Sequence, residues 1–274
     1  MALVAITREM GSLGKDVASG LSEALGVPLV YHEIADHLAD RMRVRKSHVI
    51  RLLDGSANLL ERLTADKTSL SIFSADEIVN LAIQGKGAVI RGWGATHLLR
   101  EVPHAVCVRV CAPFEVRKQR MMERTGSRDE DKVSDEIRQN DEAHTAIMRR
   151  NFHVQWTDAE NYDLVLNTER VSVRDCIDEV LRLVRSEEFA ETEASRQRLE
   201  DLALTCRVRA ALRRSPRTRE LRVSVNATRG RVTLAGMLDK AEERAAVNEV
   251  AAEAGARDID DQLRTADAIR PRFQ

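Results

Sequence analysis

Glycines and a lysine follow the first apolar run of the chain. Residues 3–6 predict a buried strand, and residues 17–25 carry apolar side chains at helical spacing. Between them lie Gly11, Gly14 and Lys15. A glycine turn from strand to helix lets backbone N–H groups point inward, and the helix N-terminus adds a positive dipole end. The stretch is therefore expected to hold phosphate groups, with Lys15 as a mobile charge for the outer ones.

The fit to the usual phosphate-loop pattern, G-x-x-x-x-G-K-[ST], is incomplete. Gly14 and Lys15 fit its end, but Glu9 stands at the first glycine position and Asp16 at the hydroxyl position. The pattern alone leaves open an ordinary strand-to-helix turn that happens to contain glycines and a lysine. Under the phosphate hypothesis, the residues expected to bind the nucleotide cofactor are Gly11, Ser12, Leu13, Gly14, Lys15 and Asp16.

A second basic glycine turn ends the strand predicted at residues 88–90. It contains Arg91, Gly92 and Trp93. In parallel α/β sheets, ligands bind outside the carboxyl ends of the strands. Arg91 is therefore a candidate anion-binding residue. The alternative is that Arg91 is a solvated loop cation and that Trp93 packs against a helix.

Arginines also mark the helix that follows the strand predicted at residues 105–112. Arg117, Arg120 and Arg124 are spaced three and four apart, so they project from one helical face. A polar break follows at residues 125–131, and another helical segment, 132–150, ends in further arginines. Charge on a helix is usually a solvated face. Here the stripe directly follows a core strand and faces a polar segment, which suits a closing lid.

Composition excludes several classes of protein. The chain has 274 residues, with 43 Lys and Arg against 44 Asp and Glu, so no nucleic-acid partner is expected. No stretch approaches the roughly 20 apolar residues of a membrane helix. The N-terminus lacks the features of a signal peptide, and we expect a cytoplasmic protein without a transmembrane segment. The four cysteines form no C-x-x-C pair and are expected to be buried thiols.

The order of elements predicts two domains. Strands alternate with helices up to residue 184, which favours a mostly parallel sheet. Within this part, residues 33–63 and 72–84 are helical in pattern, with a polar interruption at 66–71. A hairpin flanked by helices then follows. The boundaries are expected at 1–186 for the first domain, 187–196 for a linker, 197–268 for the second domain and 269–274 for a tail.

Residues 1 to about 185 resemble the cytidylate-kinase-like family, a branch of the nucleoside monophosphate kinases. The segments that carry the resemblance are residues 6–18, 90–95, 109–113, 117–122 and 161–168, in the family's order. The family's loop reads S/T-R-E-x-G-S-G-G-[KR]-x-[IV]-A. Glu9 and Asp16 are therefore features of the branch, whereas Leu13, in place of a glycine, is this chain's own departure.

The resemblance implies a P-loop three-layer α/β/α fold, with ATP and Mg²⁺ as cofactors. It implies phosphoryl transfer from ATP to a nucleoside monophosphate, with CMP as the first candidate. The catalytic residues would be Lys15, Arg120, Arg124, Arg149 and Arg150. Arg8, Arg91 and Arg117 would bind substrate, Asp16 would ligate Mg²⁺, and residues 33–71 would form the acceptor-binding segment. These cations are expected to converge on one polyphosphate.

Residues 197–268 resemble a BON domain, a small α+β module. Residues 223–225 and 230–236 carry this resemblance. It implies a regulatory or docking role, with a lipid or protein partner. A second hypothesis therefore stays open, in which the chain is a nucleotide-binding sensor or scaffold with little turnover. Leu13 and Asp16 favour the sensor, and the arginines favour the enzyme.

Overall fold

The computed structural model describes residues 1–54, 57, 66–92 and 94–266. The chain divides into two compact units. The first unit contains Met1–Lys67 and Gln84–Thr192, and the second contains Thr68–Ile83 and Glu193–Gln274. Trp93 and most of the helical segment expected at 55–63 lie outside the described residues.

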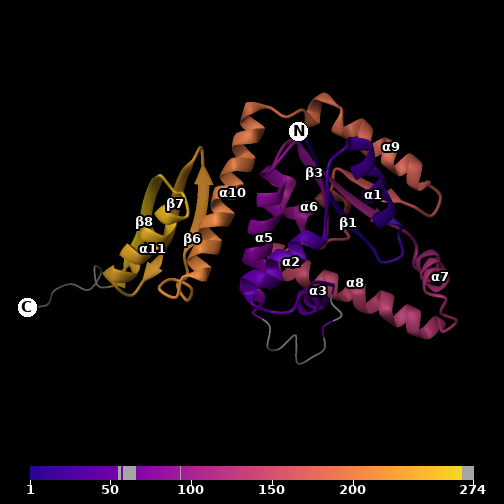
Figure 1. Ribbon diagram of the computed structural model, residues 1–274, viewed down its shortest axis with the longest axis horizontal. Helices are drawn as coiled ribbons and strands as arrows, with labels where there is room; N and C mark the ends of the chain where they lie inside the picture. The colour runs from indigo at the N-terminus through magenta and orange to yellow at the C-terminus, as the bar shows by residue number, and fades with distance from the viewer. Residues whose placement is uncertain (55–56, 58–65, 93, 267–274) are drawn as a thin grey trace, which may run out of the picture. The chain divides into compact units, whose positions relative to one another are not determined.

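The first unit is built on a parallel sheet (Figure 1). Its strands are β1 (Ala2–Arg8), β2 (Leu29–Val30), β3 (Gly87–Arg91), β4 (Ala105–Cys111) and β5 (Leu164–Asn167). They pair in the order β2-β3-β1-β4-β5, so β1 is central. Ile6 lies opposite both Arg91 and Val108, which brings the carboxyl ends of β1, β3 and β4 to one edge. The expected parallel α/β fold is confirmed.

Helices flank this sheet. They are α1 (Gly14–Leu25), α2 (His32–Met42), α3 (Lys46–Asp54), α6 (Ala95–Leu98), α7 (Phe114–Thr125), α8 (Glu130–Phe152) and α9 (Val173–Val184), with short 3-10 turns at Leu99–Glu101, Ala159–Asn161 and Glu187–Phe189. The apolar stripes of α1 and α9 pack on one sheet face, where Val17, Leu21 and Val180 meet Val4 and Val106. Helix α6 contacts β1 and β4. The turn between β1 and α1 therefore lies at the carboxyl edge of the sheet, with α1 packed on the sheet face.

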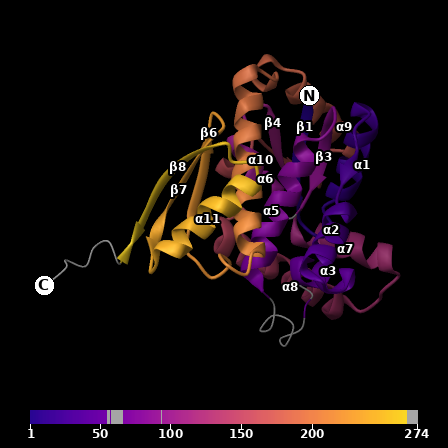
Figure 2. The same cartoon turned by 60° about the vertical axis from the view of Figure 1, so that its left-hand side comes forward.

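The second unit consists of a three-stranded sheet with helices (Figure 2) and has its own hydrophobic core. Its elements are α5 (Lys67–Ile83), α10 (Glu193–Arg214), β6 (Ser224–Thr228), β7 (Arg231–Leu238), α11 (Ala241–Glu253) and β8 (Asp258–Thr265). Strand β7 pairs antiparallel with β6 and parallel with β8. Val225 and Ala227 are buried with Val208 and Val247 of the helices, whereas Asn226 is exposed. The expected small α+β fold is confirmed.

Helix α5 differs from its sequence expectation. The helix expected to begin at Ile72 begins at Lys67, so residues 67–71 form its first turn and are not a polar interruption. Ser69 accepts a hydrogen bond from Arg213 Nε at 2.7 Å, and Leu70 is buried. Both a polar and an apolar residue of this first turn have partners in the fold, so the turn is stable as the start of the helix. Helix α5 thus lies in the second unit, although its sequence position falls between elements of the first.

The turn between β6 and β7 is capped from α10. Asp201 is buried, and its carboxylate accepts from Arg229 N at 2.7 Å and from Gly230 N at 2.8 Å. We expect Asp201→Ala to lower the free energy of unfolding by about 2–3 kcal/mol, because charge-assisted bonds are lost and N–H groups are left unsatisfied. Denaturant unfolding measures this. Glu200→Ala, on the exposed neighbour, is the control, and equal losses for both variants would contradict the capping role.

Among the described residues, no helix combines the length and apolar character needed to cross a bilayer. All four cysteines are free thiols; Cys107, Cys176 and Cys206 are buried as expected, whereas Cys111 is only partly buried. Burial raises the pKa of Cys107 to about 12, so this thiol stays protonated at neutral pH.

Candidate functional site

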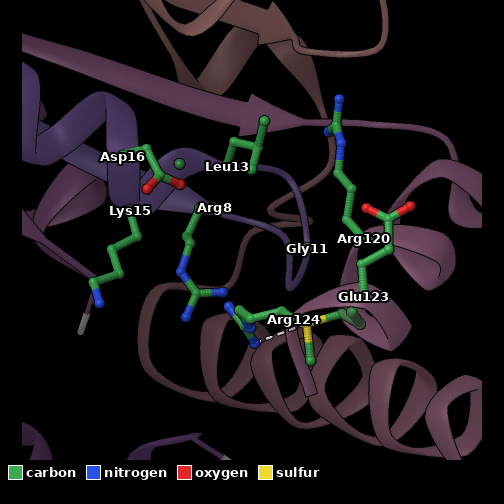
Figure 3. A pocket seen from close by; sticks show the side chains of 10 residues that line it. Arg8, Gly11, Leu13, Lys15, Asp16, Arg120, Glu123 and Arg124 are labelled. Carbon is green, nitrogen blue, oxygen red and sulfur yellow. Dashed lines mark hydrogen bonds between the residues drawn. The ribbon is translucent and has the colours of Figure 1, made fainter. Parts of the chain in front are cut away.

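A cavity of about 480 Å³ lies at the carboxyl edge of the sheet in the first unit (Figure 3). It is formed by the turn between β1 and α1 and by the second half of α7. The lining residues are Arg8, Gly11, Leu13, Gly14, Lys15, Asp16, Arg120, Met121, Glu123 and Arg124. Residues more than 100 positions apart in the sequence therefore share one site.

Glycine is required at two positions of the turn. Gly11 has φ +82°, and a Cβ there would lie 2.7 Å from the carbonyl oxygen of Arg117. A Cβ on Gly14 would lie 2.6 Å from Cβ of Arg8. Helix α1 begins at Gly14, and its first N–H groups have no partner within the helix. Asp16 N already donates to the carbonyl oxygen of Leu13, but Gly14 and Lys15 also line the cavity, so this helix end can offer their N–H groups and its dipole to an anion.

Leu13 adopts the left-handed conformation, with φ +60° and ψ +12°. This is the position where the family pattern has glycine. A leucine in this region costs roughly 1–2 kcal/mol relative to a relaxed backbone. The strain is accommodated at the cap of α1, where the carbonyl oxygen of Leu13 accepts from Asp16 N and Val17 N at 3.0 and 3.1 Å.

We expect Leu13→Gly to be more stable than Leu13→Ala by about 1 kcal/mol, because both remove the side chain but only glycine tolerates φ +60° without strain. Urea unfolding of the two variants measures the difference. Equal unfolding free energies would contradict the strain at this position. The pair of variants separates the backbone effect from the loss of the leucine side chain that lines the cavity.

The cations of the cavity are held in different ways. Arg120 donates from Nη1 to Thr168 Oγ1 at 3.0 Å and from Nη2 to the Thr168 carbonyl oxygen at 2.7 Å. Thr168 Oγ1 in turn donates to the carbonyl oxygen of Ser12 at 2.8 Å. Arg124 donates to the sulfur of Met121 at 2.8 Å. In Figure 3 the guanidinium of Arg120 points away from Arg8 and Lys15, so the expected convergence of these cations on one point is not seen in this arrangement.

Several predicted site residues lie outside this cavity lining. Arg91 is buried at the end of β3, with its guanidinium 3.7 Å from the Tyr31 ring centroid. Arg117 is buried, and Ser12 is fully buried. Arg149 and Arg150 are exposed at the end of α8, where they donate to Gln155 and Asn151 at 2.8 and 3.1 Å. The cavity therefore gathers Lys15, Arg8, Arg120 and Arg124 but not these residues.

Three residues of the site were not expected from the sequence. Thr168 joins Arg120 to the turn, and Met121 and Glu123 line the cavity. A signal for Thr168 existed, since it directly follows a predicted strand and ligand contacts concentrate at such ends. Glu123 follows Arg120 by three residues and so shares its helical face. The cavity thus carries two carboxylates, Asp16 and Glu123, among its cations.

Two half-buried histidines of the first unit, His144 and His97, have lowered pKa values. His144 of α8 stacks against Trp156, with ring centroids 4.2 Å apart, and its Nε2 lies 3.4 Å from Thr7 Oγ1. Burial, and to a lesser degree Arg8, lowers the pKa of His144 to about 4. Burial, with Arg100, likewise lowers the pKa of His97 to about 4. Both imidazoles are therefore neutral at neutral pH and add no charge to the site.

The lowered pKa of His144 predicts acid sensitivity. An unfolded histidine titrates near 6.5, so the unfolded state takes up a proton as pH falls below 6.5 while the folded state resists down to about 4. Stability is therefore lost as pH falls, by about 2 kcal/mol at pH 5 for this group. Urea unfolding from pH 7 to pH 5 should show a smaller loss for His144→Gln than for the wild type. Parallel curves would refute this; exposed His153→Asn is the control.

The described part of the chain contains no cluster of side chains that could bind a metal ion by itself. No group of three or more His, Cys, Asp or Glu residues there is arranged to hold a metal ion. Mg²⁺ in phosphoryl-transfer sites is commonly held by one or two carboxylates together with substrate phosphates. Asp16, at the cavity wall, fits that requirement as a single protein ligand.

The strand order β2-β3-β1-β4-β5, with a glycine turn before α1 at the carboxyl edge, defines the class of P-loop kinase folds. The chain belongs to the cytidylate kinase-like family, which it matches over residues 3–170. Residues 191–267 match the BON domain. A comparison with curated proteins finds no match.

Two solved structures are similar to the first part of this chain. An uncharacterised protein from Eubacterium ventriosum is 22% identical with a TM-score of 0.54, and the match covers 68% of this chain and 100% of that one. Shikimate kinase from Bacteroides thetaiotaomicron is 14% identical with a TM-score of 0.43, over 68% of this chain and 99% of that one. Only the first likeness is close enough to support the fold, and neither bears on substrate.

Proposed function

We propose that the first unit transfers a phosphoryl group from ATP to a nucleoside monophosphate, with CMP as the first candidate. The observation that carries the proposal is the shared cavity of the α1 N-terminus with Lys15, Arg120 and Arg124. Phosphoryl transfer requires aligned phosphates and neutralised charge rather than covalent chemistry from the protein. In this proposal the turn and Lys15 hold the donor, and the arginines of α7 neutralise the transferred group.

The residues present fit ATP and Mg²⁺ as cofactors. Glycine at position 14 lets the start of α1 pack directly against Arg8 and Val110, and Gly14 and Lys15 at this helix end line the cavity, which suits a phosphate at the helix N-terminus. Asp16 would ligate Mg²⁺, which when bound neutralises charge on the donor oxygens. Arg8 and Arg91 remain the proposed contacts to the acceptor. A cytoplasmic location belongs to the same proposal, because both nucleotides are found there.

The test is a panel of nucleoside monophosphates with ATP and Mg²⁺, read by coupled ADP release. We expect one monophosphate to raise the rate of ADP release well above the rate without acceptor, and CMP to be that acceptor. Lys15→Ala protein supplies the background. A wild-type rate no higher than the background with every monophosphate would refute phosphoryl transfer, and a preference for another base would refute CMP alone.

The carboxylates of the cavity favour a second candidate function, nucleotide sensing with little turnover. Like charges 4 Å apart repel by about 4 kcal/mol at an effective dielectric constant of 20. Asp16 and Glu123 would oppose a polyphosphate unless Lys15 and Mg²⁺ offset them. The sensor hypothesis predicts measurable nucleotide binding by calorimetry, with strong Mg²⁺ dependence, and no acceptor-dependent ADP release.

For the BON domain we propose docking to a lipid or protein partner. The support is the family match over residues 191–267 and a separate core in the second unit. Sedimentation of the full chain with phosphatidylglycerol vesicles tests the lipid form, with phosphatidylcholine vesicles as the control. Absence of co-sedimentation with both would remove the lipid form and leave a protein partner.

A further inference from the structure

Arg117, the first arginine of the stripe on α7, is engaged almost entirely by the protein. Its side chain is 7% exposed. Nε donates to the Ala112 carbonyl oxygen at 3.1 Å, and Nη1 donates to the Met10 carbonyl oxygen at 3.3 Å. Nη1 and Nη2 also donate to the two carboxylate oxygens of Asp141 at 3.2 and 2.9 Å. A guanidinium has five N–H donors, so little of this one remains for a substrate.

Glu9, in the turn between β1 and α1, also contacts Arg117 and the segment before α7. Its Oε1 accepts from Arg109 Nη2 at 2.5 Å, and its Oε2 accepts from Ala112 N at 3.1 Å. Oε2 also lies 3.4 Å from Arg117 Nε. Glu9 stands where the usual phosphate loop has its first glycine. In this chain that position therefore ties the start of the turn to β4 and α7.

The turn and α7 are also joined at two other places, directly at Gly11 and through Thr168 at Ser12. The space beside Gly11 is filled by the backbone of Arg117, as the 2.7 Å approach of a built Cβ shows. Further along, Thr168 joins the Ser12 carbonyl oxygen to Arg120. Helix α7 is thus fixed to the turn at Met10, Gly11 and Ser12. Asp141 extends this attachment to α8.

We propose that Arg117 is a positioning residue, which with Glu9 and Asp141 fixes α7 so that Arg120 and Arg124 stand at the cavity. The inference rests on the proposed function of that cavity. Arg124 lies seven residues beyond Arg117, about 10 Å along the helix axis at 1.5 Å per residue. A tilt of α7 by about 10° at Arg117 would then move Arg124 by nearly 2 Å, and a displacement of about 1 Å can cost a hundredfold in rate.

Asp141→Asn is the variant that weakens the contact between Arg117 and Asp141 with the smallest change in side-chain shape. It keeps the shape of the side chain, which is 29% exposed, and removes the charge that Arg117 faces. Asp135→Asn is the matched control, because Asp135 lies on the same helix and pairs with exposed Arg138 at 3.4 Å. Each change is combined with Arg124→Ala in a double-mutant cycle on the full chain. The readouts are thermal stability, calorimetric binding of MgATP and kcat with the preferred monophosphate.

We expect Asp141→Asn to lower kcat about tenfold and to shrink the effect of Arg124→Ala by a similar factor, although Asp141 and Arg124 do not share a hydrogen bond in the described contacts. Non-additivity of this kind reports coupling between sites. Asp135→Asn should add without coupling. Additive effects of Asp141→Asn and Arg124→Ala in folded proteins would overturn the positioning role.

The experiment separates this inference from the proposed function. If wild-type protein neither binds MgATP nor turns over, the proposed function fails and the inference fails with it. If wild type turns over but the cycle is additive, only the inference fails. Should Asp141→Asn unfold, Glu9→Gln provides the second variant, because it weakens the same attachment of α7 from the side of the turn. The same coupling to Arg124 is expected from it.

Discussion

Lys15→Ala is expected to lower the acceptor-dependent rate of ADP release by a factor of 10² to 10³. Lys15 lies on the cavity wall in the first turn of α1, beside the helix end that is proposed to hold the donor phosphates. Loss of one preorganised positive group at a developing charge typically costs about 3–4 kcal/mol of transition-state stabilisation. The coupled assay with ATP, Mg²⁺ and the preferred monophosphate measures the effect.

Two further lysine variants sharpen this prediction. Lys15→Arg should keep most of the activity, because the family pattern admits either residue and both carry the charge. Lys86→Ala, which removes an exposed lysine outside the cavity, should leave the rate unchanged. A Lys15→Ala enzyme as fast as wild type would show that phosphate charge at this turn is not what the protein stabilises.

Gly14→Ala is expected to damage both fold and binding. The new Cβ would lie 2.6 Å from Cβ of Arg8 and 3.2 Å from Cβ of Val110, so either the turn or the strands beneath must move. Overpacking of this kind costs about 3 kcal/mol of unfolding free energy. The displaced helix end should also weaken MgATP binding by more than tenfold. Denaturant unfolding and calorimetry measure the two effects.

Gly26→Ala is the matched control for Gly14→Ala. Gly26 ends the same helix with φ +64°, and a Cβ there meets nothing within 4 Å. Its substitution should cost only the backbone strain, about 1 kcal/mol, and leave MgATP binding unchanged. If the two alanine variants behaved alike, the close packing of the turn on β1 and β4 would not be what requires glycine at position 14.

The elements near the site were predictable because each has a local cause. The run at residues 3–6 and the apolar spacing of 17–25 predict β1 and α1, which span Ala2–Arg8 and Gly14–Leu25. Hydrophobic periodicity depends only on residues that are close in the sequence, so it predicts a strand or a helix without knowledge of the tertiary structure. The ends of elements are harder to predict from the sequence. The polar residues 66–71 predict a helix that begins at residue 72, whereas α5 begins at Lys67. Contacts with a distant helix decided that boundary.

The alternation of strands and helices, the turn with Gly11, Gly14 and Lys15, and the family resemblance all followed from the sequence, because they depend on order and spacing. The roles of the arginines on α7 did not. Arg117, Arg120 and Arg124 have the same spacing signal, yet the first is buried against Asp141 while the other two line the cavity. Their partners lie far away in sequence, as in Glu9 with Arg109 or Thr168 with Ser12. Only the folded chain brings such residues together, since burial and charge pairing are set by residues that no local pattern contains.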